Sequence, residues 1–189
     1  FRGAFALACG ERTWHVSLFA ATPYRDAAFR ALWTASGGTW RGVARDSALP
    51  PDMRVLAQHE SAPLAEVIRD INKFSNNVMA RQLFLTIGGE GGRQPGSAAR
   101  AQQVIGDWLA AKGLERHAFV LENGAGLSRI ERLTAAGLAQ LLAGAWASPL
   151  MPEFIASLPL AGVDGTMRKR SGAAGAAHVK SGLLADARA

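Results

Sequence analysis

The sequence predicts a mixed α+β fold in which a cluster of helices packs against an incomplete antiparallel sheet. The chain has 189 residues, of which 49% are hydrophobic and 19% are charged, so it can bury a sizeable core. Apolar residues recur at helical spacing through most of its length. Short runs with alternating apolar residues stand near both ends of the chain and favour strands.

Composition and charge exclude several classes of protein. Cys9 is the only cysteine, which rules out a disulfide scaffold and a cysteine-rich zinc module. No two of the four histidines are four residues apart, so we expect no metal site, and no motif calls for a cofactor. The net charge of +6 is dispersed apart from Arg168-Lys169-Arg170, a pattern that does not favour a nucleic-acid partner. The most apolar stretch, 135–147, is shorter than the about 20 residues that cross a membrane, so no transmembrane segment is expected.

Extended segments are expected where apolar residues alternate between turn-forming residues. Phe5, Leu7 and Cys9 show this alternation at the start of the chain. The expected extended segments are 1–20, a short strand within 40–55, 119–121, and 177–180 with a return through Leu183 and Leu184.

Six helices are expected between these segments, because each has an apolar stripe and capping or stop residues at its ends. Ser61 is the expected N-cap of the clearest helix, with Pro63 just inside it and Glu66 in its first turn. The expected helices run from Pro23 to a stop at 36–38, from Ser61 to Phe74, from Asn77 to Ile87, from Ser97 to Gly113, from Thr134 to Trp146, and from Pro152 to Leu158.

Two short motifs can carry chemistry. The first, Ser75-Asn76-Asn77, stands at the polar corner between two predicted helices. The Ser75 hydroxyl can relay a proton to a leaving amine, and the Asn77 amide can hold a substrate amide by donating and accepting hydrogen bonds.

The second motif, Lys180-Ser181-Gly182, ends the strand-like segment near the C-terminus. Lys180 supplies a positive charge for a terminal carboxylate, and Ser181 can hydrogen-bond the same group. Gly182 leaves room for a substrate along the strand edge. A Ser-x-Asn turn followed by a Lys-Ser/Thr-Gly strand is typical of penicillin-interacting serine enzymes.

Four blocks together closely resemble the D-alanyl-D-alanine carboxypeptidase/endopeptidase family, the class C low-molecular-mass penicillin-binding proteins. They occur in the order that the family shows and cover roughly Pro23 to the end of the chain. The blocks are Asp70–Asn77, Asn123–Arg129, Gly162–Met167 and His178–Gly182.

The resemblance implies a partial penicillin-binding, β-lactamase-like transpeptidase fold over 23–189, with 1–22 as the end of an inserted β-rich region. It implies hydrolysis of D-Ala-D-Ala bonds in peptidoglycan stem peptides in the periplasm, through an acyl-enzyme that β-lactams also form. Ser75, Asn77 and Lys180 are then the expected catalytic residues. Ser181, Gly182, Asp164 and Thr166 are the expected substrate-binding residues.

One departure from the family is severe, because no serine in the sequence has a lysine three residues later. The nucleophile motif Ser-x-x-Lys is therefore absent from these 189 residues. The only near match, Thr166-Met167-Arg168-Lys169, belongs to the Asp-Gly-Thr block and is rejected as the nucleophile. In the family the nucleophile precedes the inserted region, so we expect it before Phe1 and expect this segment alone to be inactive. The change from Lys-Thr-Gly to Lys-Ser-Gly is mild, because the hydroxyl is kept.

Each assignment has a structural alternative. Ser75 and Asn77 could simply cap helices. Lys180 could be a solvated edge-strand lysine, and Asp164 with Thr166 could form an ordinary Asx-type turn. Lys73 is expected to pair with Asp70 three residues before it.

Two alternatives concern the whole chain. In the first, it is a non-catalytic module that binds peptidoglycan or a cell-wall partner in the same groove, with its positive charge attracting anionic wall polymer. In the second, it is a basic nucleic-acid binder, which would show strongly salt-dependent binding to DNA.

Overall fold

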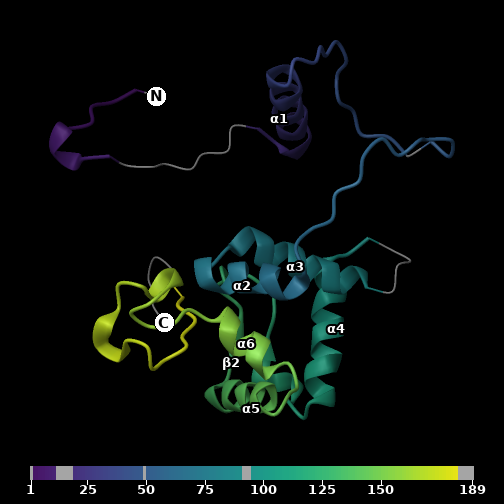
Figure 1. Ribbon diagram of the computed structural model, residues 1–189. Coiled ribbons are helices and arrows are strands. Elements are labelled where there is room, and N and C mark those ends of the chain that lie inside the picture. Colours follow the sequence, from purple (N-terminus) through teal and green to yellow (C-terminus); the bar gives the residue numbers. More distant parts are fainter. Residues whose placement is uncertain (1, 12–18, 49, 91–94, 183–189) are drawn as a thin grey trace. The chain divides into compact units, whose positions relative to one another are not determined.

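The computed structural model describes residues 2–11, 19–48, 50–90 and 95–182 and divides the chain into two compact units, Phe1–His59 and Glu60–Ala189. Each unit is described by itself (Figure 1). Within these described ranges, no helix is both long and apolar enough to cross a membrane.

The first unit is built on one long helix, α1 (Ala21–Ala35), which ends before Ser36 and Gly37 as the sequence predicts. The loop that follows folds back along the helix. The Trp33 indole donates to the Thr39 carbonyl at 3.1 Å, and Arg30 donates to the Gly42 carbonyl at 2.8 Å. Residues 40–48 and 50–55 form no strand, so the short strand expected within 40–55 is not found in its described part.

The strand expected around Leu7 is wrong. Leu7–Cys9 form a short 3-10 helix, η1, with exposed side chains, because Gly10 at a φ of 62° closes the turn by donating to the Leu7 carbonyl. A segment with alternating apolar residues forms a strand only where a second strand is available to pair with that segment. Residues 12–18 lie outside the described residues, and the assignment of 1–22 to a β-rich region stays a prediction.

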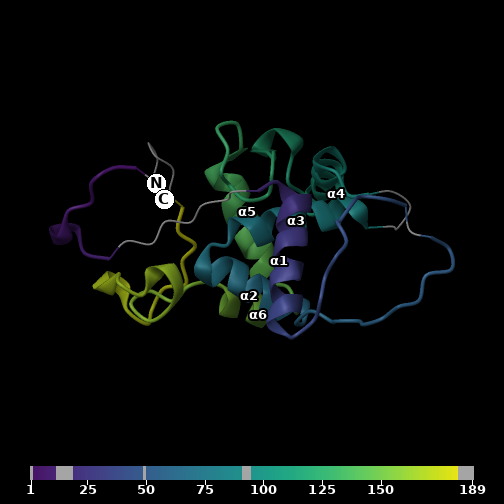
Figure 2. The same ribbon diagram turned by 90° about the horizontal axis from the view of Figure 1, so that it is seen from above.

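The second unit contains five α-helices in its described residues, which with α1 makes six in the part of the chain that the structure describes. α2 packs against α6, α3 packs along α4, and α5 contacts α6 (Figures 1 and 2). The five helices are α2 (Leu64–Phe74), α3 (Asn77–Gly89), α4 (Ala98–Ala111), α5 (Ala135–Trp146) and α6 (Met151–Ser157).

Side chains cap two of these helices at the residues where the sequence predicts a start, whereas a third cap is predicted wrongly. The side chains of Ser97 and Thr134 accept hydrogen bonds from Arg100 N and Gly137 N, as expected for N-caps. The predicted cap at Ser61 is wrong: α2 begins at Leu64 with Pro63 before it, and the Ser61 hydroxyl bonds instead to the Ala62 carbonyl.

Extended structure in the second unit is sparse. β1 (Phe119–Val120) pairs antiparallel with β2 (Arg132–Leu133), which confirms the strand expected at 119–121. The strand-like segment 177–180 makes a single antiparallel bridge, between His178 and Leu160. Its expected return through Leu183 and Leu184 lies outside the described residues.

Glycine allows α3 and α4 to approach closely. A Cβ added to Gly88 would lie 2.7 Å from the Ser97 carbonyl oxygen and 2.8 Å from the Ala101 nitrogen, both backbone atoms. Ala101 and Phe84 are buried in this contact region and belong to the small core of the second unit. The core residues are Ile71, Phe84, Ala101, Leu109, Leu114 and Ala161.

We predict opposite effects for two helical Gly→Ala substitutions. Gly88→Ala should lower the free energy of unfolding by about 1–3 kcal/mol, because its Cβ meets backbone atoms that cannot move aside. Gly144→Ala in α5, where a Cβ meets nothing within 4 Å, should raise it by about 0.5–1 kcal/mol. Urea unfolding followed by circular dichroism measures both. Equal effects of the two substitutions would contradict the role of Gly88 in helix packing.

Candidate active site

Ser75 ends α2 in a strained backbone conformation. Its φ of 53° and ψ of 47° are left-handed, and it is the only non-glycine residue with positive φ in the part of the chain that the structure describes. The next residue, Asn76, accepts a hydrogen bond from Met79 N at 3.1 Å and so caps α3. The predicted polar corner between two helices is therefore present, and Ser75 is at its apex.

Lys180 reaches this corner from the other end of the unit. Its Nζ donates to Ser75 Oγ at 2.9 Å, a contact between residues 105 positions apart in the sequence. The backbone hydrogen bond from Val179 N to the Pro159 carbonyl, at 2.8 Å, holds the segment that carries Lys180. Although Lys180 is exposed as a residue, partial burial of its ammonium lowers its pKa.

A second pair of hydroxyls lies next to Lys180. Ser181 Oγ and Thr166 Oγ1 are 2.8 Å apart, and Lys180 Nζ also donates to the Ser181 carbonyl at 2.7 Å. Thr166 belongs to a 3-10 turn, η3 (Gly165–Met167), that contacts α2. Four of the predicted site residues, Ser75, Thr166, Lys180 and Ser181, are thus linked by hydrogen bonds.

Asp164 holds η3 against α2. Its Oδ2 pairs with Lys73 Nζ at 2.5 Å, and its Oδ1 accepts from Leu160 N at 2.8 Å. The hydrogen bond from Lys73, helped by that from Leu160, lowers the pKa of the Asp164 carboxyl below its ordinary value of 3.8. The expected Lys73–Asp70 pair is wrong, because Lys73 pairs with a carboxylate 91 residues away.

Gly165 permits the same contact. It has a φ of 53°, and a Cβ at this position would lie within van der Waals overlap of the Lys73 carbonyl oxygen. Backbone of η3 and backbone of α2 therefore touch directly beside the ion pair. Each residue of the Asp-Gly-Thr block has its own part in this contact. The Asp164 carboxylate fixes η3 to α2, Gly165 lets the two backbones touch, and the Thr166 hydroxyl hydrogen-bonds to Ser181.

The remaining two predicted site residues, Asn77 and Gly182, do not take part in the hydrogen bonds that link Ser75, Lys180, Ser181 and Thr166. Asn77 is the first residue of α3 and is half-buried, and its side chain makes no hydrogen bond to another described residue. Gly182 is exposed and follows Ser181. Within the described ranges, no group of three or more histidine, cysteine or acidic side chains could hold a metal ion.

Two positioning residues were not predicted. Asn72 on α2 donates from its side chain to the buried Ser157 hydroxyl of α6 at 2.9 Å. Glu131 Oε1 accepts from Asn123 N at 2.8 Å, and also from the two flanking amides, which fixes the Asn123–Gly126 turn. The only sequence signal for either was membership in, or closeness to, one of the four blocks.

A Ser-x-Asn turn whose serine is hydrogen-bonded to the lysine of a distant Lys-Ser-Gly segment defines a class of protein, the penicillin-interacting serine peptidases. Within this class, the chain belongs to the D-Ala-D-Ala carboxypeptidase 3 (S13) family, whose family model matches residues 1–189. The resemblance seen in the sequence is confirmed.

Individual relatives agree with this membership. The chain is 32% identical over 169 residues to a D-alanyl-D-alanine carboxypeptidase of Actinomadura sp. (strain R39), covering 82% of this chain and 31% of that protein. It is 27% identical over 123 residues to the D-alanyl-D-alanine carboxypeptidase DacB of Haemophilus influenzae, covering 65% of this chain and 26% of that protein.

A solved structure shares the fold. Penicillin binding protein 4 (dacB) of Haemophilus influenzae, complexed with a β-lactam, aligns with a TM-score of 0.71 and 25% identity, covering 85% of this chain and 38% of that one. This likeness confirms the predicted fold class. The chain spans about a third of the length of these relatives.

We predict that the Lys73–Asp164 pair makes stability depend on pH. A carboxyl whose pKa is lowered on folding stabilises the protein above its ordinary pKa, and this contribution is lost as the pH falls through the lowered value. Asp164→Asn should therefore cost about 1 kcal/mol of unfolding free energy at pH 7, and the difference from the unsubstituted chain should shrink below pH 3.8. Urea unfolding at pH 7 and pH 3 measures this.

The matched control is Asp107→Asn. Asp107 pairs with Arg116, but both side chains are more than half exposed, so its substitution should cost less than about 0.5 kcal/mol at either pH. An Asp164→Asn penalty of the same size at pH 7 and pH 3 would show that the ion pair does not contribute as described.

Proposed function

We propose that this segment carries the substrate-binding and proton-relay half of a serine-type D-Ala-D-Ala carboxypeptidase that acts on peptidoglycan stem peptides in the periplasm. The proposal rests on one observation, the 2.9 Å hydrogen bond that joins Ser75 to Lys180. The reaction is acyl transfer from the penultimate D-Ala to a serine, followed by hydrolysis of the acyl-enzyme. The nucleophile comes from a Ser-x-x-Lys motif that these 189 residues do not contain.

Lys180, Ser181 and Thr166 together bind the terminal carboxylate of the peptide. An ammonium group has three N–H donors, and Lys180 uses two of them, on Ser75 and on its neighbour's carbonyl. The third donor is available to a carboxylate. The hydroxyls of Thr166 and Ser181, 2.8 Å apart and exposed, can each turn to donate to the same ligand.

Ser75 relays the proton to the departing D-Ala amine. Its Oγ accepts the hydrogen bond from Lys180, so its own hydroxyl hydrogen points elsewhere and can be donated. The partial burial that lowers the pKa of Lys180 also eases proton exchange between the two groups. As the C–N bond breaks, the amine takes this proton and D-Ala leaves.

Asn77 holds the amide next to the scissile bond. Since Asn76 already caps α3, the Asn77 side chain is not needed for capping. Its half-buried amide can donate to the peptide carbonyl and accept from the peptide N–H. β-Lactams, one of which is bound by the similar Haemophilus influenzae protein, would be covalent inhibitors of the complete enzyme.

We predict that Lys180→Ala weakens binding of an acetylated peptide ending in D-Ala-D-Ala by about tenfold or more, because a charge-assisted hydrogen bond is lost. Lys169→Ala, which removes the same charge from an exposed residue three positions after Thr166, should leave the affinity unchanged. Isothermal titration calorimetry of the 189-residue chain measures both. The peptide with a C-terminal amide, which lacks the carboxylate, should bind the unsubstituted chain as weakly as the acid binds Lys180→Ala.

The titrations, an assay of D-Ala release and labelling with penicillin together separate this proposal from its rivals. Equal affinities of Lys180→Ala and Lys169→Ala would contradict the carboxylate site. A non-catalytic binding module would keep the Lys180 dependence, but the full-length protein that contains this segment would release no D-Ala. Covalent attachment of a labelled penicillin to the 189-residue chain alone would contradict the placement of the nucleophile elsewhere.

We also predict that the two adjacent asparagines have separable roles. Asn76→Ala should lower the free energy of unfolding by about 1 kcal/mol through loss of the α3 cap, with little change in peptide affinity. Asn77→Ala should leave stability within about 0.5 kcal/mol and weaken peptide binding. Thermal unfolding and calorimetric titration of both variants test this. The reverse assignment of the two effects would show that Asn77 is the structural residue.

A further inference from the structure

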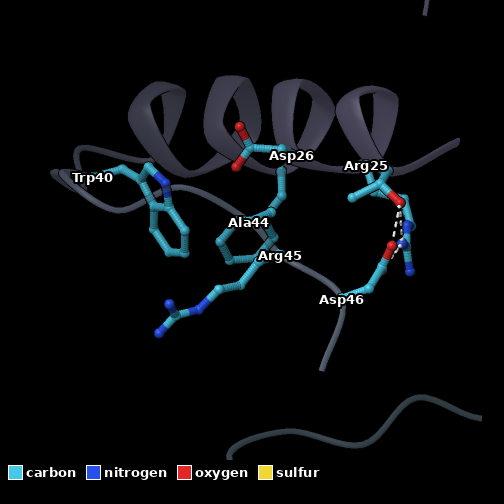
Figure 3. Close-up of a pocket in the computed structure, with 8 residues that line it drawn as sticks. Arg25, Asp26, Trp40, Ala44, Arg45 and Asp46 are labelled. Atoms are coloured by element: carbon cyan, nitrogen blue, oxygen red, sulfur yellow. Dashed lines mark hydrogen bonds and ion pairs between the residues drawn. The ribbon is translucent and has the colours of Figure 1, made fainter. Parts of the chain in front are cut away.

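The first unit has a pocket of its own, formed between one face of α1 and the loop that folds back along it (Figure 3). Thr22, Arg25, Asp26 and Phe29 recur at helical spacing, so they share one side of the helix. Trp40, Ala44, Arg45 and Asp46 line the opposite side. The pocket has a volume of about 230 Å³. Pockets for drug-sized ligands hold roughly 300–1,000 Å³, so this one suits a group the size of a single sugar ring.

Aromatic rings form one wall of the pocket. Phe29 packs edge-on against Trp40 with ring centroids 5.3 Å apart, and it stacks on Trp33 at 5.9 Å. Arg30 lies 5.8 Å from the Trp40 ring centroid and holds the indole by a cation–π contact. Trp40 nevertheless keeps 38% of its surface exposed, and Phe29 keeps 50%. The rings are therefore fixed in place but still accessible to a ligand.

Hydrogen-bonding groups with balanced charge form the rest of the lining. Asp46 accepts from Arg25 and from Thr22, both at 3.0 Å, which ties the loop to the helix. Arg45 makes no hydrogen bond or ion pair to another described residue, and its guanidinium extends away from the Arg25–Asp46 pair in Figure 3. Two arginines and two aspartates contribute no net charge, so the lining favours a neutral ligand that both donates and accepts hydrogen bonds.

These features together match the chemistry of a sugar. The C–H groups on one face of a pyranose carry partial positive charge and pack on the negative face of an aromatic ring, while hydroxyls around the rim pair with arginine, aspartate and threonine. Asp46 is already bonded to Arg25 and Thr22, and Asp26 is paired with Arg30, but these carboxylates and guanidiniums keep further acceptor and donor sites that sugar hydroxyls can use and a planar apolar ring cannot. A peptide carboxylate would meet Asp26 and Asp46 as well as the arginines. We propose that this pocket, between α1 and the 40–46 loop, binds one neutral sugar unit.

The test is a titration of the full 189-residue chain with the trisaccharide of N-acetylglucosamine. Binding is monitored through the tryptophan indole N–H signals in NMR spectra. The Trp40 signal, assigned with Trp40→Phe, should shift on titration while that of Trp146, an exposed tryptophan in α5, does not. Arg45→Ala should weaken binding about fivefold to tenfold. Since Arg45 makes no hydrogen bond or ion pair to another described residue, this variant should fold normally.

The matched control is Arg41→Ala, which removes the same side chain from an exposed residue of the same loop that does not line the pocket. It should bind the trisaccharide with unchanged affinity. Absence of any Trp40 shift at saturating sugar, or equal affinities of Arg45→Ala and Arg41→Ala, would overturn the proposal. Neither result bears on the peptide site in the second unit, because the probe has no peptide and Lys180 is intact.

Discussion

The candidate active site depends on the ion pair between Lys73 and Asp164. Lys73 is in the last turn of α2, directly before the Ser75 corner, and its side chain is only 13% exposed. Its charge is therefore poorly solvated and needs a partner close by. Asp164 supplies that partner and also accepts from Leu160 N, so a single carboxylate ties the end of α2 to the chain that enters η3.

The Lys73–Asp164 ion pair also positions the C-terminal part of the site. The residues just before Asp164 pair with the segment that ends in Lys180, through the Leu160–His178 bridge and the bond from Val179 N to the Pro159 carbonyl. The contact of Asp164 with α2 therefore also holds the paired segments next to α2. As a result, Lys180 lies beside Ser75. Because the hydrogen bonds of Lys180 and Thr166 are themselves exposed, they could not hold this arrangement alone.

The sequence was sufficient to predict the helices, the class of protein and the residues that meet at the site, because each of these leaves a local signal. The Ser97 and Thr134 caps are examples, and so is the Ser75 corner. The partner of Lys73 was missed because local spacing favours Asp70, whereas burial of the ammonium selects a carboxylate 91 residues away. The strand expected at Leu7 failed for a related reason: alternation is a local signal, but strand pairing is not local.

Under the proposed function, the backbone of Ser75 is the place where chemistry overrides local preference. A residue that ends a helix in the left-handed conformation is usually glycine or asparagine, since a Cβ there costs roughly 1–2 kcal/mol. Here the position is serine at a φ of 53°, although glycine would remove the strain. What glycine lacks is the hydroxyl that accepts the hydrogen bond from Lys180. Strain retained at one residue, with its side chain bonded to a partly desolvated lysine, therefore agrees with the proton-relay role that we propose for Ser75.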